Sequence, residues 1–499
     1  MKLTNLFLRL SCLILALVTV GLLAVGCGNT FSENPEASNS GQDGAGTEAT
    51  PTGKYDSEGY LMDEIPDGLN FNQSVRIVIS ESQKNQVAPS EDSTDVISAA
   101  IVDRNLTVED RLGIEIEFLP IAAGWNDRAT FCQTIKAASQ AGDAYDALCV
   151  YNPFPGALAS AGLLENLGDT QYIDLNGPWW PSSFTSEVVI DNTLFSLVES
   201  SSKGTLRNMH GVFFNNALIE DLNLESPYDL VAKNEWTFAN MMALIKDTWS
   251  DKNNNGVKDK DDSFGVVTGT QAKIESWFFG MGYKYCIKNE NGELDLKMRD
   301  VYYMVEWIDV FTAAAATNDF LLYEQNGHTK TFFSNNAVLY MTSLQLVENG
   351  INNGIEFDYG VVPIPKKDEN QERYLTNIAN SHDSWCIPMN VKNIDLSSAI
   401  LECMASEAYR QIAPVYFEQC IKLRYAPDER LAEMYDLIRD GIVFDFTSIF
   451  SFSFEKDPRS ILHATVKNPQ NLPWPSQWES NGPLFENGFA AILELYQSK

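Results

Sequence analysis

The sequence predicts an α/β protein with two lobes, each a mainly parallel sheet flanked by helices. Of its 499 residues, well over 400 follow an N-terminal leader and a polar segment, which is more than one hydrophobic core usually supports. Between Ser74 and Tyr151, apolar β-branched segments alternate with amphipathic helical segments. Because strands that alternate with helices are typical of parallel sheets, this pattern sets the fold class.

The first 26 residues resemble the signal peptide of a bacterial lipoprotein. Lys2 and Arg9 precede an apolar segment that ends at Val25, too short for a membrane span of about 20 residues. The segment closes on Ala24-Val25-Gly26-Cys27, which is similar to a lipobox, although lipoboxes usually carry Leu where Ala24 stands. We expect cleavage before Cys27 and acylation of its thiol, with palmitate among the chains, so that the protein is anchored at the outer face of the cell membrane. An uncleaved N-terminal helix is the alternative.

Residues 27–68 are expected to form a disordered tether. The segment from Gly28 to Gly53 consists of Ser, Asn, Gly, Thr, Ala, Pro and acidic residues with almost nothing apolar, a composition that cannot bury a core. The rest of the chain has an ordinary globular composition, with no second apolar segment long enough to cross a bilayer, and we expect a monomer. The net charge of -33 excludes nucleic acid as a partner, because its phosphates would be repelled.

Six cysteines follow Cys27, and their spacing matches no metal site. Cys149 and Cys403 lie in apolar segments, which favours buried thiols over a disulfide framework.

The first lobe is predicted from residues 69–185 and 362–410. Its expected strands are residues 74–79, 114–120 and 145–151, and its expected helices are residues 94–112 and 128–141. Ligands of parallel sheets lie beyond the carboxyl ends of the strands. This rule indicates Glu81 and Ser82 after the first strand, and Tyr151 and Asn152 at the end of the third.

The second lobe is predicted from residues 186–361 and 411–499. Strands are expected at residues 193–198 and 211–214, and Thr237 is expected to cap a helix. The Pro-containing segment from Tyr359 suits a crossover between the lobes. Further helices are expected at residues 397–407, 429–438 and 485–496.

Nine segments in this order resemble one family of binding proteins. They are RNLTVEDRLGIEIEF, GDAYDALCVY, AGLLENL, YIDLNGPWWP, GVFFNNALIEDLNL, PYDLVAKNEWTF, DKNNNGVKDKDDSFG, FDYGVVPIPKKDENQERY and EAYRQIAPVYFEQCIK. Together they are similar to family 1, maltose-binding-like extracellular solute-binding proteins of ABC importers. The resemblance implies a periplasmic-binding-protein-like fold, in which discontinuous lobes joined by crossover strands close over a solute, and an ABC permease as partner. The usual solutes of this branch are sugars and oligosaccharides.

A carbohydrate cleft needs aromatic faces for sugar C–H groups and polar side chains for hydroxyls. We select as ligand-binding candidates Glu81, Tyr151, Asn152, Glu199, Trp277, Asp383 and Trp385; Trp125 and Gln271 occupy comparable places. For each of them, a core aromatic or a solvated polar group is the alternative. Trp179 and Trp180 are as suited to hinge packing as to ligand stacking.

Residues 251–262 match a twelve-residue EF-hand loop at all but the last position, where Asp262 replaces the usual Glu. The expected ligands of a structural Ca²⁺ are Asp251, Asn253, Asn255, the carbonyl of Val257, Asp259 and Asp262. Asp261 is a second choice for the last position. An ordinary Asn/Gly-rich surface turn is the alternative.

We expect no catalysis. The sequence contains no HExxH, GxSxG or GxxxxGK motif, and it singles out no carboxylate pair of the kind that glycoside hydrolases use. A surface-anchored glycoside hydrolase or glycan-binding module is the alternative from another class, and a receptor for a peptide, acidic sugar or polyol is the alternative within the same class.

Overall fold

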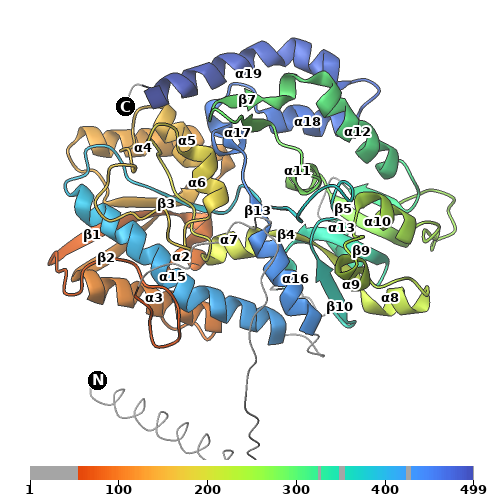
Figure 1. The fold of residues 1–499 in the computed structure, drawn as a ribbon, viewed down its shortest axis with the longest axis horizontal. Coiled ribbons are helices and arrows are strands. Elements are labelled where there is room, and N and C mark those ends of the chain that lie inside the picture. Colours follow the sequence, from red (N-terminus) through yellow and green to blue (C-terminus); the bar gives the residue numbers. More distant parts are fainter. Residues whose placement is uncertain (1–53, 324–326, 348–354, 423–428, 498–499) are drawn as a thin grey trace, which may run out of the picture. The chain divides into compact units, whose positions relative to one another are not determined.

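The computed structural model describes residues 54–323, 327–347, 355–422 and 429–497. Residues 53–499 form one compact unit. Two separate sheets, each flanked by helices, confirm the predicted two-lobed α/β class (Figure 1).

The first sheet has the strand order β12-β3-β1-β2. It contains β1 (Gln73–Ser80), β2 (Ile114–Ile121), β3 (Ala147–Tyr151) and β12 (Asp383–Cys386). The first three strands are parallel, and β12 is antiparallel to β3. Helices α3 (Val96–Leu112) and α4 (Arg128–Gln140) lie between them in the chain, as predicted. Helix α3 begins at Asp95, whose carboxylate accepts the N–H of Ser98, and ends at Gly113, where φ is 61°.

The second sheet has the order β10-β4-β9-β5-β8. Its strands are β4 (His210–Asn215), β5 (Phe264–Gly269), β8 (Phe320–Tyr323), β9 (Ala337–Ser343) and β10 (Tyr359–Val362). Only β4 runs against its four companions, so two of the four strand pairs are antiparallel and the sheet is more mixed than predicted. In each sheet, the antiparallel strand is the first one that the chain forms after it crosses from the other lobe. This strand is β4 in the second sheet and β12 in the first.

The remaining short elements include 3₁₀ turns, a β-hairpin and a pair of two-residue strands. The 3₁₀ turns are η1 (Glu81–Gln83), η2 (Trp125–Asp127), η3 (Lys297–Arg299) and η4 (Ser451–Ser453). The hairpin is β6 (Cys286–Lys288) with β7 (Leu294–Leu296), and the pair is β11 (Thr376–Asn377) with β13 (Ile442–Val443).

The other helices are mostly short. They are α2 (Lys84–Val87), α5 (Pro153–Ser160), α6 (Ser182–Val188), α7 (Lys203–Asn208), α8 (Asn216–Asp221), α9 (Pro227–Ala232), α10 (Phe238–Leu244), α11 (Ala272–Gly280), α12 (Val301–Ala315), α13 (Gly327–Phe333), α15 (Ile394–Lys422), α16 (Glu429–Asp440), α17 (Phe446–Ile449), α18 (Pro458–Lys467) and α19 (Trp474–Gln497). Thr237 caps α10 as predicted, and α15 and α19 are much longer than predicted. In the part of the chain that the structure describes, no helix is long and apolar enough for a membrane span.

Two expectations are wrong, one about a strand of the second lobe and one about a crossover between the lobes. Residues 193–198 form no regular strand, because they pair only through isolated bridges: Thr193 with Ile190, and Leu197, which exchanges two backbone hydrogen bonds with Trp385. The segment from Tyr359 is the edge strand β10 of the second sheet, not a crossover. The passages of the chain between the lobes include α7, residues 376–383, and β13 with α17; because η4 packs on α5 and α18 packs on α12, the chain returns to the second lobe between η4 and α18.

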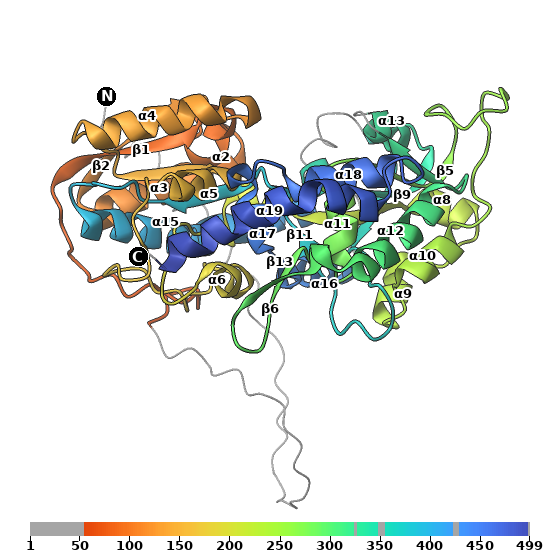
Figure 2. The ribbon, with the colours of Figure 1, turned by 90° about the horizontal axis from the view of Figure 1, so that it is seen from above.

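Helix α19 is shared by the two lobes. It contacts α12 and η3 on the side of the second sheet and α5 on the side of the first (Figures 1 and 2). Near its end, the ring of Tyr496 packs 5.2 Å from that of Phe195. The helix therefore bridges the lobes in addition to the crossovers.

Residues 54–68 belong to the folded unit, although we expected them in the tether. The Asp63 carboxylate is buried and forms an ion pair with Arg111 at 2.5 Å; Arg410 lies 3.5 Å away. Asp63, Cys403 and Glu407 have ligand atoms within 4.8 Å of one another, but Arg111 and Arg410 both pair with Glu407 too. The group is thus a buried ion-pair cluster that joins this segment to α3 and α15.

Candidate functional site

A cavity of about 490 Å³ lies between the two lobes. It adjoins the end of β3 at Tyr151 and the segment after β5 at Gln271, so it opens at the carboxyl ends of strands from both sheets. Residues 379–381 of the second crossover also line it. This is the position at which parallel α/β sheets bind ligands.

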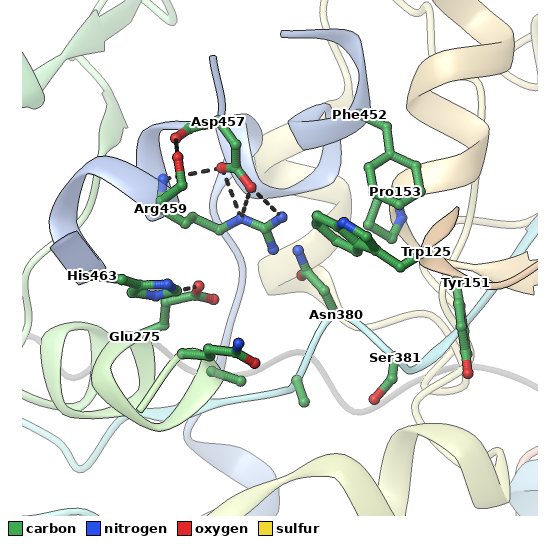
Figure 3. Close-up of a pocket in the computed structure, with 14 residues that line it drawn as sticks. Trp125, Tyr151, Pro153, Glu275, Asn380, Ser381, Phe452, Asp457, Arg459 and His463 are labelled. Atoms are coloured by element: carbon green, nitrogen blue, oxygen red, sulfur yellow. Dashed lines mark hydrogen bonds and ion pairs between the residues drawn. The ribbon is translucent and has the colours of Figure 1, made fainter. Parts of the chain in front are cut away.

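The first lobe supplies an aromatic wall. Trp125 belongs to η2 after β2, and its indole is 60% exposed. Its ring lies 4.6 Å from that of Phe452 in an edge-to-face arrangement, beside Tyr151 and Pro153 (Figure 3). Phe452 in turn packs against Phe154 of α5. The wall offers apolar faces with one hydroxyl, that of Tyr151, which is 3.0 Å from the hydroxyl of Ser82.

The opposite wall is polar and charged. Arg459 of α18 donates two hydrogen bonds from Nε to the carboxylate of Asp457 and one from Nη2, at 2.7–3.1 Å (Figure 3). Nε2 of His463 lies 3.0 Å from Oε1 of Glu275, which belongs to α11. Each carboxylate that lines the cavity therefore has a basic partner.

The Glu275 carboxylate is only 4% exposed, yet it favours its ionised form. Burial alone would raise its pKa, but Arg459 and His463 outweigh burial, so the pKa lies below its ordinary value. The polar wall therefore presents a fixed hydrogen-bond acceptor, next to the donors of Arg459.

Gln271 links β5 to α11 in an unusual backbone conformation. Its φ is 60° and its ψ is -123°, a region that residues other than Gly rarely adopt and that costs about 1–3 kcal/mol. Its side chain is exposed and lines the cavity, and within the described residues no hydrogen bond engages its amide. Such outliers cluster where the backbone is held for a ligand.

Of the seven ligand-binding candidates, the structure brings only Tyr151 into the cavity wall. Glu81 is exposed in η1 outside the residues that line the cavity. Asn152 is buried at the start of α5. The side chains of Trp277 and Trp385 are at most 1% exposed; Trp277 packs against Phe238 and Phe311, so it is part of the second core.

Glu199 and Asp383 are also buried in the first lobe. Glu199 lies 3.8 Å from Arg104, and Asp383 begins β12. Burial raises the pKa of Asp383 to about 7, and the charge of Glu199 adds to this effect. Both groups belong to the lobe interior and are not in the cavity wall.

The paired tryptophans have a packing role. The indole N–H groups of Trp179 and Trp180 donate to the two carboxylate oxygens of Glu402 on α15, at 3.0 and 2.8 Å. Burial raises the pKa of Glu402 to about 8. Both indoles are buried, which favours the hinge-packing interpretation over stacking on a ligand.

The loop of residues 251–262 folds around its own acidic side chains. The Asp251 carboxylate accepts the backbone N–H groups of Asn255 and Gly256, and the Asp262 carboxylate accepts those of Lys252 and Asp259. Gly256 has a φ of +73°, as the sharp turn at the sixth position requires.

Two amides of the same loop, on Asn253 and Asn255, donate to the Asp259 carboxylate. The backbone N–H of Asp261 and these amides lower the pKa of Asp259. The Val257 side chain is exposed. The loop thus gathers carboxylate and amide oxygens, the donor types that Ca²⁺ prefers.

The C-terminal contribution to the cavity was not predicted from the sequence. This contribution consists of Phe452, which packs on Trp125 and Phe154, and of Asp457, Arg459 and His463. Arg459 and His463 act on Glu275 of α11, which lies about 180 residues earlier in the chain. The signal that was available is local: Asp457-Pro458 is an N-cap followed by Pro, and it begins a helix that carries Arg459 and His463 on neighbouring turns.

The comparisons with known proteins concern structure alone, since no family model and no curated protein sequence matches the chain. A cyclo/maltodextrin-binding protein in complex with maltotetraose aligns at 14% identity and a TM-score of 0.52, over 85% of this chain and 96% of that one. The maltose/maltodextrin-binding domain MalE of Bdellovibrio bacteriovorus, bound to maltotriose, aligns at 11% identity and a TM-score of 0.51, over 85% of this chain and 100% of that one.

The GacH receptor of Streptomyces glaucescens, studied without ligand and with acarbose, aligns at 12% identity and a TM-score of 0.51, over 83% of this chain and 99% of that one. At these identities the likeness establishes the fold, which nearly the whole of each neighbour shares with this chain. The chain has the two-lobed α/β fold of maltodextrin-binding and related sugar-binding proteins.

Proposed function

We propose that the protein is a family 1, maltose-binding-like solute-binding protein that binds a sugar or oligosaccharide between its lobes and delivers it to an ABC permease. The observation that carries this proposal is the cavity with one aromatic and one polar wall, at the carboxyl ends of strands from both sheets. A sugar ring has apolar faces and a polar rim of hydroxyls, so it matches both walls at once.

Within this proposal, Trp125 and Tyr151 stack on sugar rings, whereas Gln271, Glu275 and Arg459 bind hydroxyls. Glu275 acts as an acceptor, and Arg459 donates through N–H groups that Asp457 leaves free. Contacts from both lobes to one ligand would favour the closed state, because a ligand shifts an equilibrium by its differential affinity.

Binding without turnover fits the electrostatics of the cavity better than hydrolysis does. A glycoside hydrolase needs one carboxylic acid that holds a proton near neutral pH. The pKa of Glu275 is lowered instead, by its basic neighbours. We therefore propose a receptor and no catalytic role.

The lipid anchor and the metal are also part of the proposal. Cys27 and residues 28–53 of the predicted tether lie outside the described residues, and we propose that an acylated Cys27 holds the protein at the outer face of the membrane. We propose further that residues 251–262 bind a structural Ca²⁺ through Asp251, Asn253, Asn255, Val257, Asp259 and Asp262.

Isothermal titration calorimetry with a panel of neutral mono- and oligosaccharides tests the central proposal. The protein would carry Cys27→Ser, which leaves the folded residues unchanged and prevents acylation. We expect stoichiometric binding to one sugar class, with no hydrolysis product by chromatography. Product formation would instead support the hydrolase, and binding only to peptides or polyols would remove the carbohydrate assignment.

A further inference from the structure

The first two crossovers run side by side between the lobes. The backbone N–H of Ala379 donates to the carbonyl of Asn208 at 3.0 Å, and the hydroxyl of Ser381 donates to the Asn208 side chain at 2.9 Å. Met209 and Ile378 form a backbone bridge. Any change in the angle between the lobes must pass through this joint.

Asp383 sits where the second crossover enters the first sheet, against the start of α7. A Cβ added to Gly204 of α7 would lie 1.9 Å from Oδ2 of Asp383, so the carboxyl fills a space that only Gly leaves open. The hydroxyl of Ser202 lies 3.4 Å from the same oxygen. In the described part of the chain, Oδ1 of Asp383 is buried and accepts no hydrogen bond.

Two buried acids, Glu199 and Asp383, lie in this interior, and the pKa of both is raised despite two arginines nearby. The groups that act on Asp383 are Glu199, Arg104 and Arg207, together with the thiol of Cys149. Burial raises the pKa of Asp383 to about 7, with Glu199 as the second cause, and it also raises the pKa of Glu199 itself. The neighbouring His382 is neutral near pH 7, because burial lowers its pKa to about 4, and Cys149 stays protonated because burial raises its pKa.

We propose that Glu199 and Asp383 share one proton at the joint between the crossovers, and that loss of this proton to solvent loosens the joint and makes the motion of the lobes depend on pH. With the proton bound, one carboxylate faces Arg104 and the other acid is neutral against Gly204. Without it, two buried carboxylates repel each other, and Asp383 must move away from α7.

The inference concerns the hinge of the proposed receptor, but its test requires no ligand. Hydrogen–deuterium exchange of the ligand-free protein is measured at pH 6 and pH 8.5 and corrected for the intrinsic effect of pH on amide exchange. We expect several-fold faster corrected exchange at the higher pH in residues 203–209 and 376–383. Infrared spectra over the same range should show a carboxylic acid band that is lost near pH 7.

Two variants test whether Asp383 is the carboxyl that loses the proton. In Asp383→Asn the infrared band near pH 7 and the exchange step should both disappear, because the amide is neutral at every pH. Glu402→Gln removes another buried carboxyl of the first lobe, one that accepts the indole N–H groups of Trp179 and Trp180 and does not contact Asp383, and it should leave the exchange step of residues 203–209 and 376–383 unchanged.

Equal corrected exchange at the two pH values in the unmodified protein would overturn the proposal, as would the absence of a titrating band. If Asp383→Asn does not fold, the exchange comparison in the unmodified protein and the infrared band in Glu402→Gln still decide, because Glu402, whose pKa is about 8, no longer contributes a band in that variant. A failure of carbohydrate binding would alter neither readout, so the two proposals fail separately.

Discussion

The guanidinium of Arg459 lies 5.6 Å from the ring centroid of Trp125, so a cation from one wall of the cavity meets an indole from the other. Arg459 belongs to α18, which packs against α12 of the second lobe, whereas Trp125 follows β2 of the first. The contact joins the two lobes where both of them line the cavity.

Replacing Trp125 tests the aromatic wall. Trp125→Ala should weaken sugar binding about tenfold, or about 1.4 kcal/mol, because one stacking face is lost. Tyr302→Ala is the control, since Tyr302 is 88% exposed on α12 and lies outside the cavity. Calorimetry that gave equal affinities for the two variants would contradict the role of Trp125.

Gln271→Gly should separate stability from affinity. Glycine relieves the strain at a φ of 60°, so we expect an increase in the free energy of unfolding of about 1 kcal/mol, together with weaker sugar binding because the amide is lost. Urea unfolding and calorimetry measure the two effects. Asn223→Gly, at a φ of 51° on the end of α8, is the matched control and should leave affinity unchanged; unaltered affinity in Gln271→Gly would remove Gln271 from the site.

The Ca²⁺ proposal predicts a metal-dependent melting temperature. Ca²⁺ should raise the melting temperature of the protein, and EDTA should reverse the rise, because a ligand of the native state stabilises it by mass action. Asp251→Asn should abolish most of the rise. Asp247→Asn changes an acid outside the loop and should preserve the rise. If Ca²⁺ does not raise the melting temperature of the unmodified protein, residues 251–262 form an ordinary surface turn and not a metal site.

Glu402 should make the protein less stable as the pH rises. Its folded-state pKa of about 8 lies above the usual value of 4.5, so its stabilising contribution is complete below pH 4.5 and is lost as the pH rises through 8. The loss is on the order of a few kcal/mol for this buried group. Glu402→Gln should flatten this part of the pH profile in denaturant unfolding, and an unchanged profile would show that Glu402 titrates normally.

Asp63→Ala should destabilise the fold by about 3–5 kcal/mol, because two arginines would lose a buried partner. Asp67→Ala is the neighbouring control: its ion pair with Lys54 is exposed and should contribute nothing measurable. Urea unfolding compares them. Similar midpoints for the two variants would mean that residues 54–68 add little to the folded unit.

The elements of the first lobe could be predicted because their signals are local. The strands and helices from Gln73 to Tyr151 follow from period-2 and period-3.6 patterns, and the Asp95 cap and Gly113 mark the ends of α3. The Pro-containing segment at Tyr359 was wrongly predicted as a crossover, because proline is tolerated after an edge strand as well as in a crossover.

The ligand-binding residues were harder to predict, because the burial of a side chain depends on partners far away in the sequence. Trp385 and Asp383 follow a crossover, as expected of cleft residues, but the pairing of β12 with β3 places both in the interior. Arg459 and His463 could not be selected from the sequence, because their partner Glu275 lies on α11, far away in the chain, and only the fold places α18 beside it. Polar residue types could be selected from sequence, whereas their exposure required the fold.

The antiparallel strand β12 has a consequence for biosynthesis. Its partner β3 ends at Tyr151, and all five strands of the second sheet lie in the chain between the two. Each of those five strands has therefore left the ribosome before residues 383–386 are available to complete the first sheet. The sheet whose synthesis begins first is therefore the later of the two to be completed. Until then, the edge of β3 is without the strand that covers it, which lies more than 200 residues downstream.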